Sequence, residues 1–249
     1  MELSPLLYGI QRGTLSLNNR NISFMSWRAR ARQNPSASLL AAQLVSLALY
    51  AAFESVPGGE VLLGAFGTLV LLLVVWVVIR SPAISWIAWI LAAPSVVLSL
   101  LSWLSFNPIL LVWAALLDAA LYFYGAGGLI AYMMGDDRVT LDELFAAGAT
   151  FTLIAWGFAY LYLVCQALSP GSFAGGTHPE ESRTFIELLF LSFANLSATG
   201  LSDILPITSP ARVLVMLEQF TGVAYIAVVV SRLIGLTIVR HKGKGKGTF

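Results

Sequence analysis

From Ser192 to Ile204 the chain reads SFANLSATGLSDI, a run of small and hydroxyl-bearing residues between two strongly apolar segments. Apolar residues make up 58% of the whole chain, charged residues make up only 11%, and the mean hydropathy is +0.82. These values are far from those of a soluble protein, whose surface must be largely polar. The composition therefore predicts an integral membrane protein, in which such a polar stretch needs a specific reason.

Six apolar windows are long enough for a membrane-spanning helix, which needs about 20 residues to cross the hydrocarbon core. We expect these spans at about residues 37–54, 60–80, 84–105, 108–134, 143–168 and 210–236. Basic residues, which favour the cytoplasmic side of a membrane, gather before the first span and after the last. They are Arg12, Arg20, Arg28, Arg30, Arg32, Arg240, Lys242, Lys244 and Lys246. Both termini are therefore expected in the cytoplasm, in a multi-pass protein of the cell (inner) membrane that is surrounded by lipid.

The fifth and sixth spans are separated by a shorter apolar stretch, residues 184–196 with the sequence TFIELLFLSFANL. Its 13 residues are too few to cross a membrane, and apolar segments of this length are commonly re-entrant. Irregular backbone at membrane depth is tolerated only where protein surrounds it or where it lines a water-filled space. We therefore expect a short helix that enters the membrane and a loop, Ser197–Asp203, that lines a cavity or pore.

The loop after this short helix has the properties of a cation site built from the backbone. A helix presents partial negative charge at its C-terminus, and here the C-terminus points toward Ser197. Gly200 allows unusual backbone angles, and its small neighbours allow carbonyl oxygens to be exposed. Because a ring of carbonyl oxygens can replace the water around a dehydrated cation, the loop is expected to attract cations.

From Gly200 to Thr208 the sequence is GLSDILPIT, and an arginine and a long apolar helix follow it. Together with the preceding short helix, this arrangement resembles the pore loop and inner helix of the potassium channel superfamily. The resemblance covers about residues 143–236. In the last span, the residues that resemble the inner helix of bacterial two-helix pore modules are Glu218, Gly222, Tyr225, Arg232 and Gly235.

The resemblance implies an all-α membrane protein with six spans and one re-entrant pore helix, assembled as a homotetramer around a shared pore. The implied selectivity filter consists of Ser197, Ala198, Thr199, Gly200, Leu201, Ser202 and Asp203. A monovalent metal ion, K⁺ or Na⁺, would bind the backbone carbonyls of Ala198, Thr199, Gly200 and Leu201. The resemblance implies neither a cofactor nor a nucleic-acid partner.

The filter departs from the family's T-V-G-Y-G-D pattern at Ala198, Leu201 and Ser202, which replace Thr, Tyr and the second Gly. Ser202 would be strained at a positive φ, where the family's glycine is not. We therefore expect a cation channel with weak or altered selectivity for monovalent cations. The same departures favour an alternative, a non-conducting membrane scaffold or regulatory subunit derived from a channel.

The sequence divides into four segments with different compositions. Residues 1–36 are expected to form a basic cytoplasmic segment, residues 37–135 a four-helix membrane domain, and residues 143–239 the pore module. Residues 240–249 are a basic cytoplasmic tail.

Two acids flank the expected filter. Asp203 has the position of the family's carboxylate at the filter mouth, and it could equally be a turn residue that caps nearby amides. Glu187 lies near the start of the short helix, where the helix dipole favours an acid. It could pair with Arg183, four residues earlier, or it could support the filter.

Three residues of the last span could support or gate the pore. Glu218 is expected to pair with Arg212 or with the pore loop. Gly222 could bend the helix or allow a neighbouring helix to approach closely. Arg232 lies near the inner end of the span, where its side chain could extend to the membrane interface.

Asp118 is an ionisable residue about ten positions into the fourth span, where such groups are costly. A neighbouring hydroxyl or indole could satisfy it, or it could mark a path for ions or protons. His178 is placed beside two acids in the loop before the short helix, and it is expected to be a solvated loop residue or a group that titrates near neutral pH.

Other classes of function lack their sequence signals. No phosphate-binding loop, nucleophile with a base, or metal-ligand cluster suggests an enzyme. A voltage sensor needs a ladder of basic residues within one span, and spans one to four contain only the terminal Arg80. A secondary transporter would need paired broken helices, and only one break is evident. Cys165 is the single cysteine, so it cannot form a disulfide within the chain.

Overall fold

The computed structural model describes residues 34–53, 67, 70–76, 85–105, 107–135, 140–176 and 181–244. Most of the basic segment 1–36, most of the expected span 60–80, His178 and residues 245–249 of the tail lie outside the described residues. The helices are α2 (Pro35–Phe53), α4 (Ser85–Ser105), α5 (Pro108–Met133), α6 (Leu141–Leu168), α7 (Phe185–Leu196) and α8 (Ser209–Lys244), and residues 70–76 are also helical.

Two three-residue strands, β1 (Phe173–Gly175) and β2 (Ile204–Pro206), form an antiparallel pair on either side of α7 in the chain. The sequence analysis did not predict these strands. They join the segment after α6 to the segment before α8, with Ala174 opposite Leu205. The pair therefore closes a loop around the short helix and fixes where that loop ends.

Side chains cap the helices at the positions where the helices begin. The Asn107 side chain accepts a hydrogen bond from the Ile109 amide at 3.0 Å, and Pro108 is the first residue of α5. The Thr140 hydroxyl accepts from the Glu143 amide at 3.2 Å at the start of α6. These caps satisfy amides that the first helical turn leaves without partners, so the bounds of both helices follow from local chemistry.

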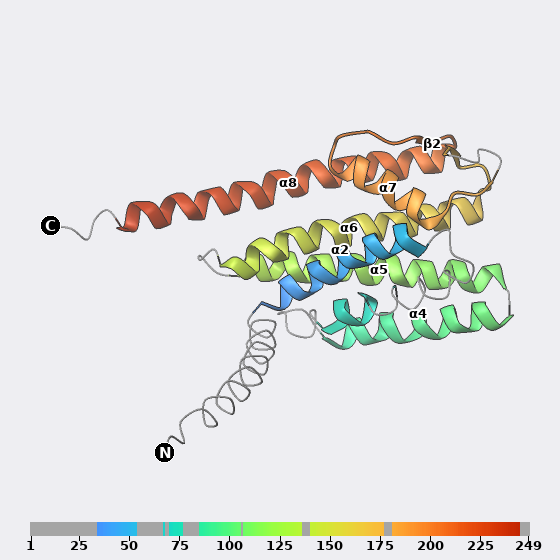
Figure 1. Cartoon of the computed structure of the whole chain (residues 1–249), viewed down its shortest axis with the longest axis horizontal. Helices are drawn as coiled ribbons and strands as arrows, with labels where there is room; N and C mark the ends of the chain where they lie inside the picture. Colours follow the sequence, from blue (N-terminus) through green and yellow to red (C-terminus); the bar gives the residue numbers. More distant parts are fainter. Residues whose placement is uncertain are drawn as a thin grey trace, which may run out of the picture.

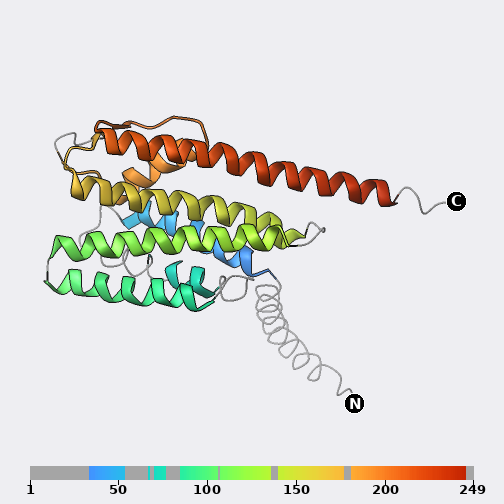
Figure 2. The same ribbon diagram turned by 180° about the vertical axis from the view of Figure 1, so that it is seen from behind.

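The helix α6 is at the centre of the fold (Figure 1). It packs against α5 and α2 on one side and against α7 and α8 on the other, and α4 packs on the far side of α5. Figure 2 shows the same stack from behind, with α8 extending well beyond the other helices. The helix α8 continues past residue 236, where its span was expected to end, and reaches Lys244.

Aromatic residues fill the core around α6. Trp156 and Tyr122 are fully buried, and their ring centroids lie 5.7 Å apart. Trp156 also packs edge-on against Phe185, the first residue of α7, at 5.9 Å. This cluster joins the early helices to the short helix, so the position of α7 depends on both halves of the chain.

Among the described residues, three helices are long and apolar enough to cross a membrane: Ile109–Met133, Leu141–Leu168 and Ser209–Val229. They coincide with the expected spans at 108–134, 143–168 and 210–236. Shorter apolar helices occupy Pro35–Tyr50, Trp86–Leu101 and Phe185–Leu196. The described part of the chain is thus mostly helical and apolar, as expected for an all-α membrane protein.

Candidate functional site: the loop after α7 and its supports

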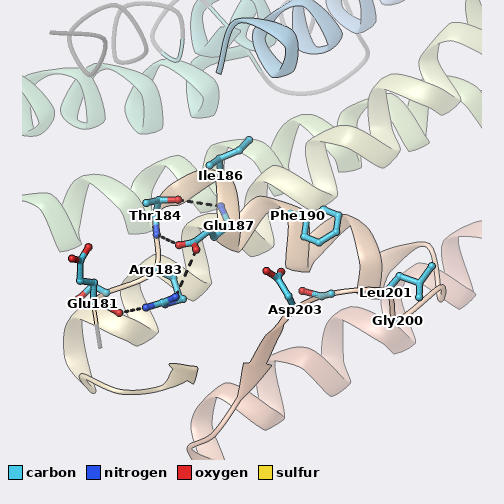
Figure 3. A pocket seen from close by; sticks show the side chains of 11 residues that line it. Glu181, Arg183, Thr184, Ile186, Glu187, Phe190, Gly200, Leu201 and Asp203 are labelled. Atoms are coloured by element: carbon cyan, nitrogen blue, oxygen red, sulfur yellow. Dashed lines mark hydrogen bonds and ion pairs between the residues drawn. The ribbon is translucent and has the colours of Figure 1, made fainter. Parts of the chain in front are cut away.

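The start of α7 is held by a network of polar contacts (Figure 3). Thr184 and Glu187 form a capping box, in which each side chain accepts a hydrogen bond from the backbone amide of the other. Arg183 forms the expected ion pair with Glu187, at 3.6 Å. The backbone of Arg183 is itself held by Gln166 of α6, which accepts from its amide at 2.8 Å and donates to its carbonyl at 2.9 Å.

The end of α7 is closed by the hydrogen-bond pattern of a Schellman motif. The Thr199 amide donates to the Ala194 carbonyl at 3.1 Å, and the Ala198 amide donates to the Asn195 carbonyl at 3.0 Å. This motif requires a left-handed backbone conformation at the residue between Ser197 and Thr199. That residue is Ala198, and its φ is 59°. Glycine is the usual residue at this position, because a β-carbon there is strained.

The strain that was expected at Ser202 therefore lies at Ala198, which is the one non-glycine residue with a positive φ in the described part of the chain. Gly200 has a φ of 64°, as its glycine identity allows. The Ser202 amide instead donates to the Gly200 carbonyl at 3.1 Å, and the Ser202 hydroxyl accepts from the Ile204 amide at the same distance. Ser202 is thus a turn residue with local hydrogen bonds.

The far end of the loop is anchored to β1. Gly175 opposes Ile204 in the strand pair, and a β-carbon at Gly175 would lie 1.9 Å from the Asp203 carbonyl oxygen. Only glycine permits this approach of the two backbones. Because the Schellman motif holds the start of the loop and Gly175 holds its end, residues 198–203 are fixed at both ends.

A pocket of about 930 Å³ lies between the start of α7 and this loop (Figure 3). Glu187 and Phe190 of α7 line it, together with Gly200, Leu201 and Asp203 of the loop. Leu201 is 77% exposed, and Asp203 is also exposed. The pocket thus brings together the two acids, Glu187 and Asp203, that the sequence placed around the expected filter.

Glu218 lies behind the loop, where it is fully buried between three helices. Its carboxyl group accepts a hydrogen bond from the Tyr162 hydroxyl of α6 and is hydrogen-bonded to the Ser192 hydroxyl of α7. The Ser192 oxygen also lies 2.7 Å from the Ala155 carbonyl oxygen of α6. Glu218 of α8 therefore connects the short helix α7 to α6 through hydrogen bonds.

Of the two partners expected for Glu218, Arg212 is not the one found. The Arg212 side chain donates to the Pro206 carbonyl of β2 at 3.3 Å. The physical reason is helical geometry: six positions amount to about one and two-thirds turns, which places the two side chains on different faces of α8. Glu218 faces α6 and α7, whereas Arg212 faces the strand pair.

Two further contacts attach α8 to its neighbours. Gly222 is buried against the end of α7, and a β-carbon there would lie 2.1 Å from the Leu196 carbonyl oxygen. This is the close approach that was one of the two expectations for Gly222. The Tyr225 hydroxyl donates to the Ala147 carbonyl of α6 at 2.6 Å. Arg232 is half-buried ten positions beyond Gly222 and is not part of the pocket.

Asp118 lies apart from the loop, in α5. It is 8% exposed, and the Ser95 hydroxyl of α4 donates to it, as the expectation of a nearby hydroxyl anticipated. Cys165 is free and buried. Within the described residues, no group of three or more His, Cys, Asp or Glu side chains could hold a metal ion.

Sequence analysis missed Tyr162, Ser192 and Gln166. Each is a polar residue in an apolar helix, which is a signal that it needs a buried partner. The partners lie 17 to 56 positions away in the chain, however, and no local pattern identifies them.

Residues 139–238 match the family model described as "Ion channel". No curated protein and no solved structure matches the chain. The matched segment contains α6, α7, the loop and α8, so this part of the chain is an ion channel domain. More specifically, it is a pore module of the potassium channel superfamily, as the sequence resemblance indicated. The matched family is a family of channels and not of enzymes.

Proposed function

We propose that the chain forms a homotetrameric cation channel of the cell membrane, with Ser197–Asp203 as its filter. The observation that carries this proposal concerns the loop carbonyls within the pore module. In the described part of the chain, the carbonyls of Ala198, Thr199 and Leu201 accept no hydrogen bond, and the residues themselves are exposed. Oxygens that lack partners at the C-terminal end of a helix are suited to a dehydrated monovalent cation, K⁺ or Na⁺.

The exposed face of α8 favours assembly with other copies. It carries large apolar residues at helical spacing, and they are Val213, Met216, Leu217, Phe220 and Val223. A single copy of the filter loop cannot enclose an ion, so several copies must surround the pore. In a ring of subunits with closed rotational symmetry, neighbouring subunits would cover part of this face of α8. In this arrangement α8 is the inner helix, α6 is the outer helix, and the pocket beside Asp203 opens at the outer mouth.

We further propose six spans, with α7 as a re-entrant pore helix, and both termini in the cytoplasm. The domain division follows: residues 37–135 form a separate membrane domain, and residues 143–239 form the pore module.

Weak or altered selectivity is favoured by three residues of the filter, Ala198, Leu201 and Ser202. They replace the hydroxyl, the aromatic brace and the flexible position of the family's filter. Arg232, near the inner end of α8, is assigned to the membrane interface.

The test is flux of K⁺, Na⁺ and Cl⁻ into liposomes that contain the purified protein. We expect cation flux with little discrimination between K⁺ and Na⁺, and no Cl⁻ flux. Gly200→Val is the control for the role of the loop. A β-branched residue is disfavoured at the φ of 64° found at Gly200, so this variant should have a distorted loop and a reduced cation flux. Mass measurement in detergent should give a tetramer for both proteins. A tetramer with no flux would instead support the non-conducting scaffold, and a stable monomer would contradict the channel.

A further inference from the structure

A second cavity, of about 180 Å³, lies in the membrane domain and away from the filter loop. Residues of α2, α4, α5 and α6 line it together with Gly67 and Leu71, and half of the lining residues are aliphatic. Its polar lining consists of the Asp118 carboxyl group and the hydroxyls of Tyr50, Ser95, Ser99 and Tyr160. The proposed conduction path does not use this cavity.

Among the described residues that line this cavity, Asp118 is the one acid, and there is no Lys or Arg among them. Its side chain makes one hydrogen bond, from Ser95, in the described part of the chain. The ion pair found among the described residues is Arg183–Glu187, so no Lys or Arg described there pairs with Asp118. A carboxylate at this depth is costly unless a positive group accompanies it.

A second buried polar group beside the cavity also lacks a partner. The Tyr122 hydroxyl is fully buried and has no hydrogen-bond partner among the described residues. Tyr122 lies four positions after Asp118 on α5, which places both residues on the same face of the helix. Its ring stacks on Tyr160, with centroids 5.6 Å apart. Asp118 thus shares the cavity with the aromatic residues Tyr50 and Tyr160 and with aliphatic residues.

This combination selects the chemistry of the occupant. The lining offers one carboxyl group and neutral hydroxyls, whereas a hard metal cation takes most of its protein ligands from carboxylates and carbonyls. An organic ammonium ion places its charge against the carboxylate and its apolar body against the walls, and the Tyr50 and Tyr160 rings attract its charge. The volume also fits, because a cavity of about 150 Å³ accommodates a benzene ring.

The cavity is connected to the pore module by direct ring contacts. Tyr50 and Tyr160 both pack against Phe185, the first residue of α7, with centroids 5.8 and 4.8 Å apart. A molecule that displaces either tyrosine ring therefore changes the packing at the start of α7.

We propose that the cavity beside Asp118 binds a small organic ammonium ion with a body about the size of one aromatic ring, and that its occupancy alters the pore helix α7. The binding does not depend on the proposed channel function. The effect on conduction rests on that function, so the two are tested separately.

Binding is measured by fluorine NMR of 4-fluorobenzylamine, which is protonated at neutral pH, with the full-length protein in lipid nanodiscs. Asp118→Asn should weaken binding at least tenfold, because it removes the charge and keeps the acceptor for Ser95. Asp118→Glu should retain binding. Glu181→Gln is the matched control, because it also replaces a carboxylate by its amide, at an exposed acid outside the cavity, and it should have no effect.

The uncharged analogue 4-fluorobenzyl alcohol should bind to the unmodified protein at least tenfold more weakly than the amine does. The alcohol and the amine should bind to Asp118→Asn with equal affinity. Equal binding of amine and alcohol to the unmodified protein would overturn the proposal, as would undiminished amine binding to Asp118→Asn. Displacement of the amine by Na⁺, but not by Li⁺ at the same ionic strength, would show an inorganic cation site and would also overturn it.

The effect on the pore is measured as cation flux into liposomes with and without 4-fluorobenzylamine. The amine should change the flux of the unmodified protein at least twofold and should leave the flux of Asp118→Asn unchanged. An equal effect of the amine on the flux of both proteins would mean that the amine acts at another site. That result would overturn the proposed coupling between the cavity and α7. Amine binding without any basal flux would support the cavity site and overturn the proposed function alone.

Discussion

Gly222 of α8 packs directly against the backbone of Leu196, the last residue of α7. A β-carbon at position 222 would lie 2.1 Å from the Leu196 carbonyl oxygen and 2.8 Å from its carbonyl carbon. Backbone atoms cannot rotate away as a flexible side chain can, so the helices must separate if residue 222 gains a side chain. This contact lies immediately before the loop that forms the proposed filter.

Gly222→Ala is therefore expected to destabilise the protein, by about 1–3 kcal/mol as other overpacked sites are. Gly235→Ala is the matched control on the same helix, because no atom lies within 4 Å of its added β-carbon. Alanine is the better helix former, so the control should be neutral or slightly stabilising. Thermal unfolding and the fraction of tetramer in detergent measure both effects. Unchanged assembly with an altered open probability for Gly222→Ala would favour a hinge instead.

Tyr162→Phe tests the hydrogen bond to Glu218. The change leaves a fully buried carboxyl oxygen without its partner, so we expect a loss of up to about 3 kcal/mol, the cost of an unsatisfied buried acceptor. Tyr225→Phe removes the same atom from a bond to a neutral carbonyl, and it should cost about 1 kcal/mol. Chemical denaturation of the two variants measures the difference. Equal losses would mean that Glu218 does not hold α7 in place through Tyr162.

Ala198→Gly should stabilise the end of α7, because Ala198 has the left-handed conformation of a Schellman motif. The expected gain is about 1 kcal/mol, the lower end of the strain for an L-residue in this conformation. Gly200→Ala is the reciprocal control: it introduces the same strain at a φ of 64° with no atom within 4 Å of the new β-carbon. Thermal unfolding should move in opposite directions for the two variants. A loss of stability in Ala198→Gly would contradict the left-handed cap.

The selectivity of the filter is tested by Ala198→Thr combined with Ser202→Gly. The pair restores a hydroxyl at the inner site and a flexible position at the outer one, and the preference for K⁺ over Na⁺ should rise about fivefold to tenfold, or about 1 kcal/mol. Stability should fall, because a β-branched residue is disfavoured where Ala198 is left-handed. Bi-ionic flux measurements give the ratio. An unmodified protein that already discriminates strongly would contradict this account of the filter.

Asp203 is expected to concentrate cations at the mouth of the pore. Asp203→Asn should lower cation flux at low ionic strength and have a smaller effect at high ionic strength, where the field is screened. Glu181→Gln is the control, because Glu181 lines the same pocket at its other end and is also exposed. Flux measured across a range of salt concentrations separates the two. An equal loss at every ionic strength would mean that Asp203 stabilises the loop instead.

Much of the fold follows from local chemistry, which a sequence displays directly. The apolar lengths of 108–134, 143–168 and 210–236 predicted the three long helices, and the 13-residue stretch 184–196 predicted the short helix α7. The pair Arg183–Glu187 follows from a spacing of four residues, with Arg183 immediately before the N-cap of α7 and Glu187 in its first turn. Such features depend on neighbours in the chain, so they require no knowledge of how helices cross.

The tertiary structure decided the partners that lie far apart in the chain. Glu218 meets Tyr162 and Ser192 because α8 is rotated so that this face meets α6 and α7, and a rotation about the helix axis has no signal in a short sequence pattern. The strain at Ala198, and not at Ser202, arises because the hydrogen bonds that close α7 require a left-handed residue there. Sequence alone thus determined the membrane class, the places of the apolar helices α5, α6, α7 and α8, and the pore module. Packing between helices decided which polar groups support the loop, since each of those contacts depends on three-dimensional placement.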